Sequence, residues 1–112
     1  MQRRYRLRDD EQFQRVKNDG RSWYHRLLVL CVLPNGLEYS RCGFSVSKRV
    51  GKAAVRNRVK RLLREAARAR QALITPGQDL VFIARRPIAS ADYHDVDRAV
   101  QQLLGQAGLL LD

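Results

Sequence analysis

Basic side chains gather in the middle of the chain, and their chemistry is the clearest that the sequence offers. A helix over residues 55–71 would place five polar side chains on one side: Asn57, Lys60, Arg61, Arg64 and Arg68. Lysine and arginine bind phosphate, arginine through paired hydrogen bonds. Soluble helices usually mix charges to form ion pairs, yet Glu65 is the only acid between residues 44 and 70. The pattern favours a polyanionic partner over an ordinary solvated face.

Residues suited to protein-based catalysis are few. The histidines are His25 and His94, and Asp92, Asp95 and Asp97 open the predicted last helix. Acids are favoured in a first helical turn by the positive end of the helix dipole, so these aspartates need no metal to explain them. The sequence predicts no catalytic residue and no metal site in the protein, and a metal-dependent nuclease is a minor alternative.

Two further patterns are weaker than they look. Gly51-Lys52 is followed by Ala53, whereas a phosphate-binding P-loop needs Ser or Thr there and a second glycine upstream. Cys31 and Cys42 belong to no CxxC motif, which argues against zinc. We expect both cysteines to be small buried hydrophobes without a disulfide.

The elements that would position the basic residues follow from hydrophobic periodicity. We expect a helix from Asp9 to Gly20, capped by Asp9 with Gln12 bonding back, then strands at 22–26, 27–33 and 41–47. A helix over 55–71, a strand over 79–84 and a helix begun by Ser90 or Asp92 follow. The order predicts an α+β fold with about three helices packed on a four-stranded sheet. Its βαβ unit would by the general rule cross over right-handed.

Length and charge narrow the class of protein. The 112 residues make one domain, with 22 Lys and Arg against 11 Asp and Glu and a net charge of +11. This is typical of a nucleic-acid-binding protein. Residues 1–8 form a basic arm that could be flexible. The longest apolar run, 27–33, is too short to span a membrane, so we expect a cytoplasmic protein without a membrane partner.

The segment 44–65 closely resembles the signature of the bacterial ribonuclease P protein subunit. The matching residues are Phe44-Ser45-Val46-Ser47-Lys48-Arg49, Gly51 and Arg56-Asn57-Arg58-Val59-Lys60-Arg61-Leu62-Leu63-Arg64-Glu65. The resemblance extends over nearly the whole chain. It includes Arg6-Leu7, Phe13, Gly20 and Ile83-Ala84-Arg85-Arg86-Pro87 in the family's order.

The resemblance implies an RNA partner that carries the active site. In the family, Mg²⁺ bound chiefly by the RNA activates water, and the reaction removes the 5′ leader of precursor tRNA. It also implies a left-handed βαβ crossover. By position, the surface that docks on the catalytic RNA comprises Lys48, Arg49, Lys52, Arg56, Asn57, Arg58, Lys60, Arg61, Arg64 and Arg68.

The resemblance further implies a cleft that binds the single-stranded leader. By position its residues are Phe13 and Lys17 on the first helix, Val29 and Cys31 on one strand, and Ser45 and Ser47 on the neighbouring strand. Many relatives carry aromatic residues where Lys17 and Cys31 stand. We therefore expect weaker base stacking and more charge attraction in this cleft.

Other classes remain as alternatives at this stage. A non-catalytic ribosome-associated RNA-binding protein would share the charge and the fold, but not Arg56-Asn57-Arg58 in its context. A helix-turn-helix DNA-binding protein is disfavoured by the strands. Cleavage of precursor tRNA by the protein alone, the catalytic RNA alone and both together would separate these classes.

Overall fold

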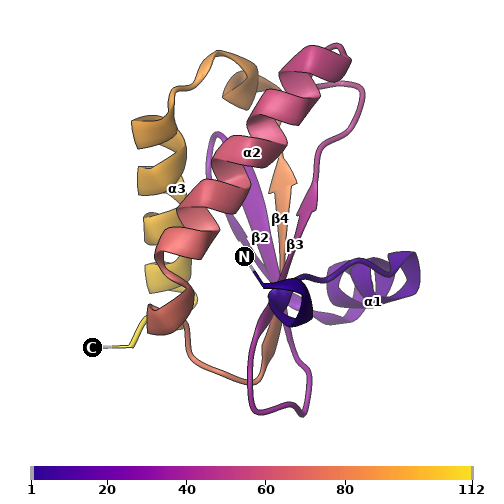
Figure 1. Ribbon diagram of the computed structural model, residues 1–112, viewed down its shortest axis with the longest axis vertical. Coiled ribbons are helices and arrows are strands. Elements are labelled where there is room, and N and C mark those ends of the chain that lie inside the picture. Colours follow the sequence, from indigo (N-terminus) through magenta and orange to yellow (C-terminus); the bar gives the residue numbers. More distant parts are fainter. Residues whose placement is uncertain (1, 112) are drawn as a thin grey trace.

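The computed structural model describes residues 2–111 of the chain. The helices and strands in chain order are α1 (Asp10–Asp19), β1 (Arg21–Tyr24), β2 (Leu28–Pro34), β3 (Arg41–Ser45), α2 (Ala53–Ala69), β4 (Gln78–Ala84) and α3 (Tyr93–Gln106). The four strands form one sheet in the order β1-β2-β4-β3. Strands β3 and β4 are parallel, and the other pairs are antiparallel. This confirms the expected α+β fold of three helices on a four-stranded sheet (Figure 1).

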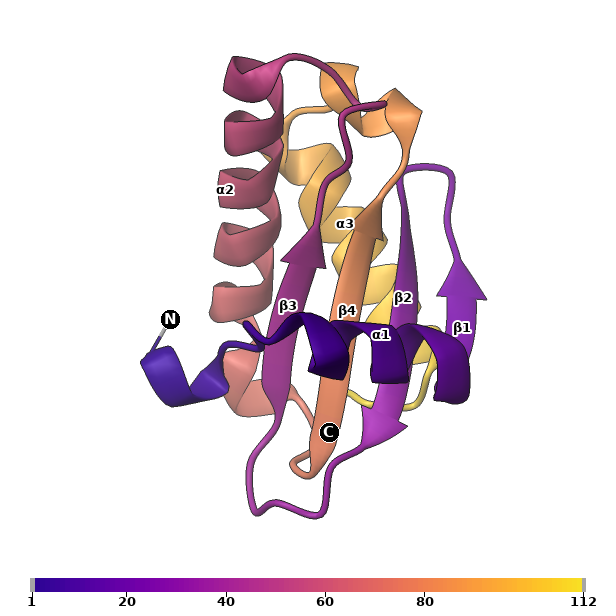
Figure 2. The same ribbon diagram turned by 90° about the vertical axis from the view of Figure 1, so that its right-hand side faces the viewer.

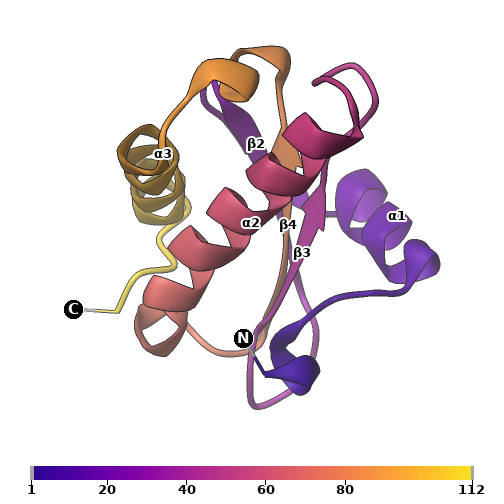
Figure 3. The same ribbon diagram turned by 45° about the horizontal axis from the view of Figure 1, so that its top comes forward.

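Helices cover both faces of the sheet. Figure 3 shows α1 on one side and α2 with α3 on the other. Strand β2 is apolar along its whole length because helices cover both of its faces. Leu28 and Leu30 join the core under α2 and α3, whereas Cys31 belongs to the smaller cluster under α1.

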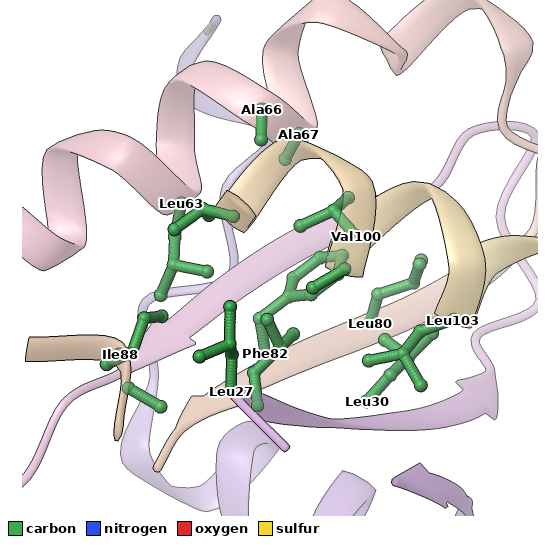
Figure 4. Close-up of a cluster of buried hydrophobic side chains, with 14 of the residues drawn as sticks. Leu27, Leu30, Leu63, Ala66, Ala67, Leu80, Phe82, Ile88, Val100 and Leu103 are labelled. Carbon is green, nitrogen blue, oxygen red and sulfur yellow. The ribbon is translucent and has the colours of Figure 1, made fainter. Parts of the chain in front are cut away.

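The larger core lies between the sheet, α2 and α3 (Figure 4). The apolar stripe of α2 points into it, with Leu63, Ala66 and Ala67 fully buried. The small side chains of Ala66 and Ala67 allow α3 to pack closely against α2. On the sheet, Phe82 is fully buried and stacks on the half-buried Phe44, with ring centroids 5.7 Å apart.

Glycine permits the close packing of α1 against the sheet. Helix α1 ends at Gly20, where a Cβ would stand 2.5 Å from the carbonyl oxygens of both Val16 and Val32. A Cβ on Gly43 would stand 2.5 Å from the Phe13 ring. Phe13 therefore lies directly on the backbone of β3.

Side-chain caps fix where two helices begin. The Asp9 carboxylate accepts from the amide of Glu11 at 2.8 Å, so Asp9 caps α1 as expected, without the reciprocal Gln12 bond of the predicted capping box. Helix α3 has the full capping box instead: Asp92 accepts from the Asp95 amide, and Asp95 accepts from the Asp92 amide.

The crossover from β3 through α2 to β4 is left-handed. Figure 2 views the sheet from the α1 side, with β3 and β4 both running upward and β4 to the right of β3. Helix α2 packs on the opposite face from α1, which is the far side in this view. A right-handed connection would need the helix on the near side. The resemblance therefore predicted the hand correctly, and the general rule for βαβ units did not.

The N-terminal segment is folded against the sheet. A short 3-10 turn spans Arg3–Tyr5, Leu7 is 4% exposed, and the Leu7 amide donates to the Cys42 carbonyl at 2.8 Å. The apolar Leu7 thus packs beside β3 and anchors the basic segment there. No helix within the described residues is long and apolar enough to cross a membrane.

Two ion pairs tie distant parts of the chain together. Arg41 on β3 contacts Asp79 on β4 through two hydrogen bonds of 2.8 and 2.7 Å. Arg70, after α2, forms a two-pronged pair with Asp97 on α3. Both cysteines are free and buried, as expected, and burial raises the pKa of the Cys42 thiol to about 12.

Candidate nucleic-acid interface

A groove lies at the outer edge of β3, between α1 and α2. We call it the β3 groove; its volume is about 510 Å³. It is lined by Arg6, Leu7, Arg8, Asp10, Phe13, Gln14, Lys17, Cys42, Phe44, Ser45, Val46, Lys60 and Arg64. Because β3 is the edge strand, side chains from both faces of the sheet reach it.

The lining of the β3 groove is cationic with aromatic surface. Five of its residues are Lys or Arg, and the single acid is Asp10. The half-buried ring of Phe13 rests on Gly43, and Lys17 follows one helical turn later. Cationic grooves with aromatic platforms hold single-stranded nucleic acids. The absence of a side chain at Gly43 leaves room on β3 for the Phe13 ring.

Two residues expected on the RNA-docking surface, Lys60 and Arg64, line the same groove as Phe13 and Lys17. They project from successive turns of α2 and are both half-buried. The Arg64 Nε–H is buried and has no hydrogen-bond partner among residues 2–111. The groove therefore joins part of the predicted docking set to part of the predicted cleft set.

A second set of polar residues lies outside the groove on exposed surface. We call it the docking face; its members are Lys48, Arg49, Lys52, Asn57, Arg61 and Arg68. Lys48, Arg49 and Lys52 belong to the loop before α2, and the others to α2 itself. Arg68 forms an ion pair with Glu65 at 3.1 Å, with both side chains more than half exposed. Such a surface pair is weak and can exchange for a phosphate.

Two arginines of the predicted docking set make contacts within the protein. Arg58 donates to the carbonyl oxygens of Ala89 and Ala91, which ties α2 to the segment before α3. The Arg56 Nε–H donates to the Gly51 carbonyl at 3.2 Å and so helps to hold the loop before α2 in place. Arg58 thus has a structural role that the sequence pattern did not indicate.

The predicted cleft set is only partly brought together. Phe13, Lys17 and Ser45 line the β3 groove, but Val29, Cys31 and Ser47 do not. Cys31 is 4% exposed under α1, with its sulfur 3.3 Å from the Ser22 hydroxyl. The strand of Val29 and Cys31 is also not the neighbour of β3, because β4 lies between them. Strand β3 ends at Ser45, so the exposed Ser47 belongs to the following loop.

The groove also contains residues that the sequence reasoning missed. Arg6, Arg8 and Gln14 line it, although the first two were assigned only to a basic arm. Leu7 was the available signal: an apolar residue between two arginines indicates a segment that packs, with its charged neighbours held near the same site.

The aspartates at the start of α3 already make structural contacts within the protein. Asp92 and Asp95 form the capping box, and the hydrogen bond from the Asp92 amide holds the pKa of Asp95 below its usual value. The Arg70 guanidinium likewise lowers the pKa of Asp97. Burial, and then the charge of Arg26, lowers the pKa of His25. Within residues 2–111 no group of three or more His, Cys, Asp or Glu side chains could hold a metal ion.

Comparisons with known proteins show the family to which the chain belongs. The sequence model of the family Ribonuclease P matches residues 1–108. Over 111 residues the chain is 50% identical to the "Ribonuclease P protein component" of Roseiflexus castenholzii, covering 98% of this chain and 91% of the relative. It is 46% identical over 112 residues to the protein of the same name from Herpetosiphon aurantiacus, covering 100% of this chain and 91% of that one.

Solved structures show the same architecture. The ribonuclease P protein of Staphylococcus aureus superposes with a TM-score of 0.87 at 30% identity, covering 95% of this chain and 97% of that one. The protein from Thermotoga maritima gives a TM-score of 0.82 at 32% identity, covering 90% and 96%.

Fold and site together define a small basic RNA-binding subunit. The chain belongs to the ribonuclease P protein family. Proteins of this family are subunits of an endoribonuclease that matures the 5′ ends of tRNA, with the catalysis in the RNA.

Proposed function

We propose that this chain docks on the catalytic RNA through its docking face and holds the 5′ leader of precursor tRNA in the β3 groove. One observation carries the proposal: Phe13, Lys17, Lys60 and Arg64 meet in one groove of about 510 Å³ beside the docking face. An aromatic ring beside cationic side chains is suited to bind a stacked base together with the neighbouring phosphates. The docking face suits a second, larger polyanion.

The two surfaces share α2, which connects their tasks. Arg61 and Arg68 are exposed on the docking face, while Lys60 and Arg64 line the groove. An RNA bound along the docking face would place a leader strand within reach of the groove. The protein would thus position substrate beside an RNA active site without supplying a reacting group.

The Mg²⁺ that the reaction requires belongs, in this proposal, to the RNA. The aspartates at the start of α3 support this division, because Asp92, Asp95 and Asp97 are committed to caps and ion pairs. We expect the protein to act in the cytoplasm, where tRNA is matured.

Leader binding is tested by comparing two substrates with each variant. Phe13→Leu keeps an apolar group over Gly43 but removes the aromatic face. Holoenzyme affinity for precursor tRNA with a leader several nucleotides long should fall by about 1–3 kcal/mol, the contribution of stacking one base. Affinity for mature tRNA should hardly change. Equal losses for both substrates would place Phe13 in the structural core only.

Lys17→Ala is the matched electrostatic variant. Its defect should also depend on the leader, and it should fade as salt screens the Coulomb attraction.

In parallel, precursor tRNA should be cleaved by the catalytic RNA with this protein but not by the protein alone. Cleavage by the protein alone would overturn the assignment of catalysis to the RNA.

A further inference from the structure

A second pocket, of about 420 Å³, lies at the C-terminal end of α2. We call it the tyrosine pocket, because Tyr5 and Tyr39 line it together with Glu38, Arg68 and Gln71. Figure 2 shows the N-terminal segment, which carries Tyr5, beside this end of α2. The volume falls in the range of small-ligand sites.

The two tyrosine rings contact each other, and an arginine guanidinium lies against both. Their rings meet edge to face, with centroids 5.7 Å apart. The Arg4 guanidinium lies 4.7 Å from the Tyr5 centroid and 5.3 Å from the Tyr39 centroid, but Arg4 is not among the pocket-lining residues. The cation therefore supports the rings without filling the pocket.

The wall that carries Tyr39 is held by hydrogen bonds. The Asn35 side-chain amide donates to the Tyr39 carbonyl at 3.2 Å. The neighbouring Ser40 is 3% exposed; its hydroxyl donates to the Thr75 carbonyl at 2.7 Å and accepts from the Gln78 amide at 3.0 Å. The backbone at Tyr39 is thus held in place before any ligand binds, which lowers the entropic cost of ordering this segment on binding.

The polar groups that line the tyrosine pocket are of kinds that suit a nucleotide. Arg68 supplies a cation for phosphate, and its present partner Glu65 is solvent-exposed. Glu38, also in the lining, offers a carboxylate that accepts hydrogen bonds from base N–H groups and repels phosphate. The side-chain oxygen of Gln71, another lining residue, is buried without a hydrogen-bond partner among the described residues, so the lining includes a hydrogen-bond acceptor that a ligand could satisfy.

The N-terminal segment separates this pocket from the β3 groove. Tyr5 lines the pocket, whereas Arg6 and Leu7 line the groove, and Leu7 is hydrogen-bonded to Cys42 of β3. A leader strand in the groove would have to pass over this segment to reach the tyrosines. Arg68, by contrast, belongs both to the pocket and to the docking face.

We infer that the tyrosine pocket binds one unpaired nucleotide of the catalytic RNA, with its base on Tyr5 and Tyr39 and its phosphate at Arg68. The inference rests on the proposed docking of α2 on that RNA. It adds a site where a base, rather than only the phosphate backbone, is held.

The test measures equilibrium binding of the protein to the catalytic RNA alone. The variant Tyr5→Leu/Tyr39→Leu removes both aromatic faces and should weaken binding by about fivefold or more, the lower end expected for stacking one base. Because no charge is lost, the slope of log K against log salt should stay unchanged. Tyr5→Phe/Tyr39→Phe retains both faces and should bind as the unaltered protein does.

Two controls separate this inference from the proposed function. Tyr24→Leu removes a 67% exposed tyrosine on β1 and should leave binding unchanged. Arg61→Ala, on the docking face but lining neither site, should weaken binding and flatten the salt slope. If Arg61→Ala weakens binding and the folded double Leu variant does not, the pocket assignment is wrong and the docking proposal stands. If neither does, the docking proposal fails.

The source of the nucleotide is tested with the holoenzyme. The double Leu variant should bind precursor tRNA, with or without a leader, as the unaltered protein does once the RNA is saturated with protein. A defect confined to the substrate with a leader would show that the pocket holds leader nucleotides and would overturn the inference. Circular dichroism establishes that each variant is folded before its binding is compared.

Discussion

At the scale of single residues, Gly43 decides whether Phe13 can serve the β3 groove. A Cβ at this position would stand 2.5 Å from the ring, closer than any real contact of that kind. Gly43→Ala should therefore displace the ring and lower the free energy of unfolding by about 1–3 kcal/mol, as overpacking does. Leader-dependent binding of precursor tRNA should weaken as well.

The matched control for this prediction is Gly105→Ala. Gly105 lies in α3 with nothing within 4 Å of its would-be Cβ. Alanine there should raise stability by up to about 1 kcal/mol, because it favours helix and restricts the unfolded chain. Chemical denaturation compares both variants. A Gly43→Ala protein as stable as the unaltered one, with its leader binding intact, would show that Phe13 can move without cost.

Arg58 carries a second prediction at the residue scale. Its guanidinium donates to the carbonyl oxygens of Ala89 and Ala91, so Arg58→Ala removes donors from two carbonyls. We expect a loss of about 1–3 kcal/mol in unfolding free energy, measured by denaturation. The salt slope of RNA binding should change less than in Arg61→Ala. A flattened slope with unchanged stability would instead assign Arg58 to a phosphate contact.

At the scale of elements, α2 and α3 are joined by the pair of Arg70 with Asp97, which adds a pH dependence. Arg70 lowers the pKa of Asp97 in the folded protein. A carboxylate with a depressed folded pKa stabilises the fold above its unfolded pKa, near 4, and loses that stabilisation as pH falls through the folded value. Stability should therefore decline below about pH 4.

Asp97→Asn isolates this contribution. The variant should be less stable than the unaltered protein at pH 7, and its stability should fall less steeply toward pH 3. Urea denaturation across this range measures both quantities. Parallel stability curves for the two proteins would show that Asp97 and Arg70 gain nothing from their contact.

The elements themselves could largely be predicted from the sequence, and their arrangement at the site only in part. Hydrophobic patterning located the three α-helices and the four strands approximately, because buried positions leave either a regular stripe or a continuous apolar run. It could not show that β4 inserts between β2 and β3, since strand order depends on non-local pairing. The separation of Cys31 from the groove follows directly from that insertion. The left-handed crossover came from the family resemblance, because local rules favour the opposite hand.

The hydrogen-bond and packing partners of individual side chains could not be predicted from the sequence pattern either. Arg58 and Arg61 look alike in the sequence, yet one bonds to backbone carbonyls and the other is exposed. Tyr5 and Tyr39 are 34 positions apart in the sequence, and they meet where the N-terminal segment packs against the sheet. Helical projection gives the side of a helix on which a residue lies, but not what lies opposite it.

At the scale of the whole molecule, a net charge of +11 should make salt act in opposite directions on the free and the RNA-bound protein. Mutual repulsion of like charges destabilises the compact free chain, so raising salt from about 50 to 300 mM, which shortens the Debye length to below 10 Å, should raise its Tm. Phosphate contacts weaken with salt through counterion release. Bound RNA stabilises the folded state by an amount that grows with the logarithm of its affinity, so the Tm of the complex should fall over the same range. Thermal denaturation of the protein alone and with excess catalytic RNA measures both trends, and a Tm of the free protein that falls with added salt would contradict the prediction.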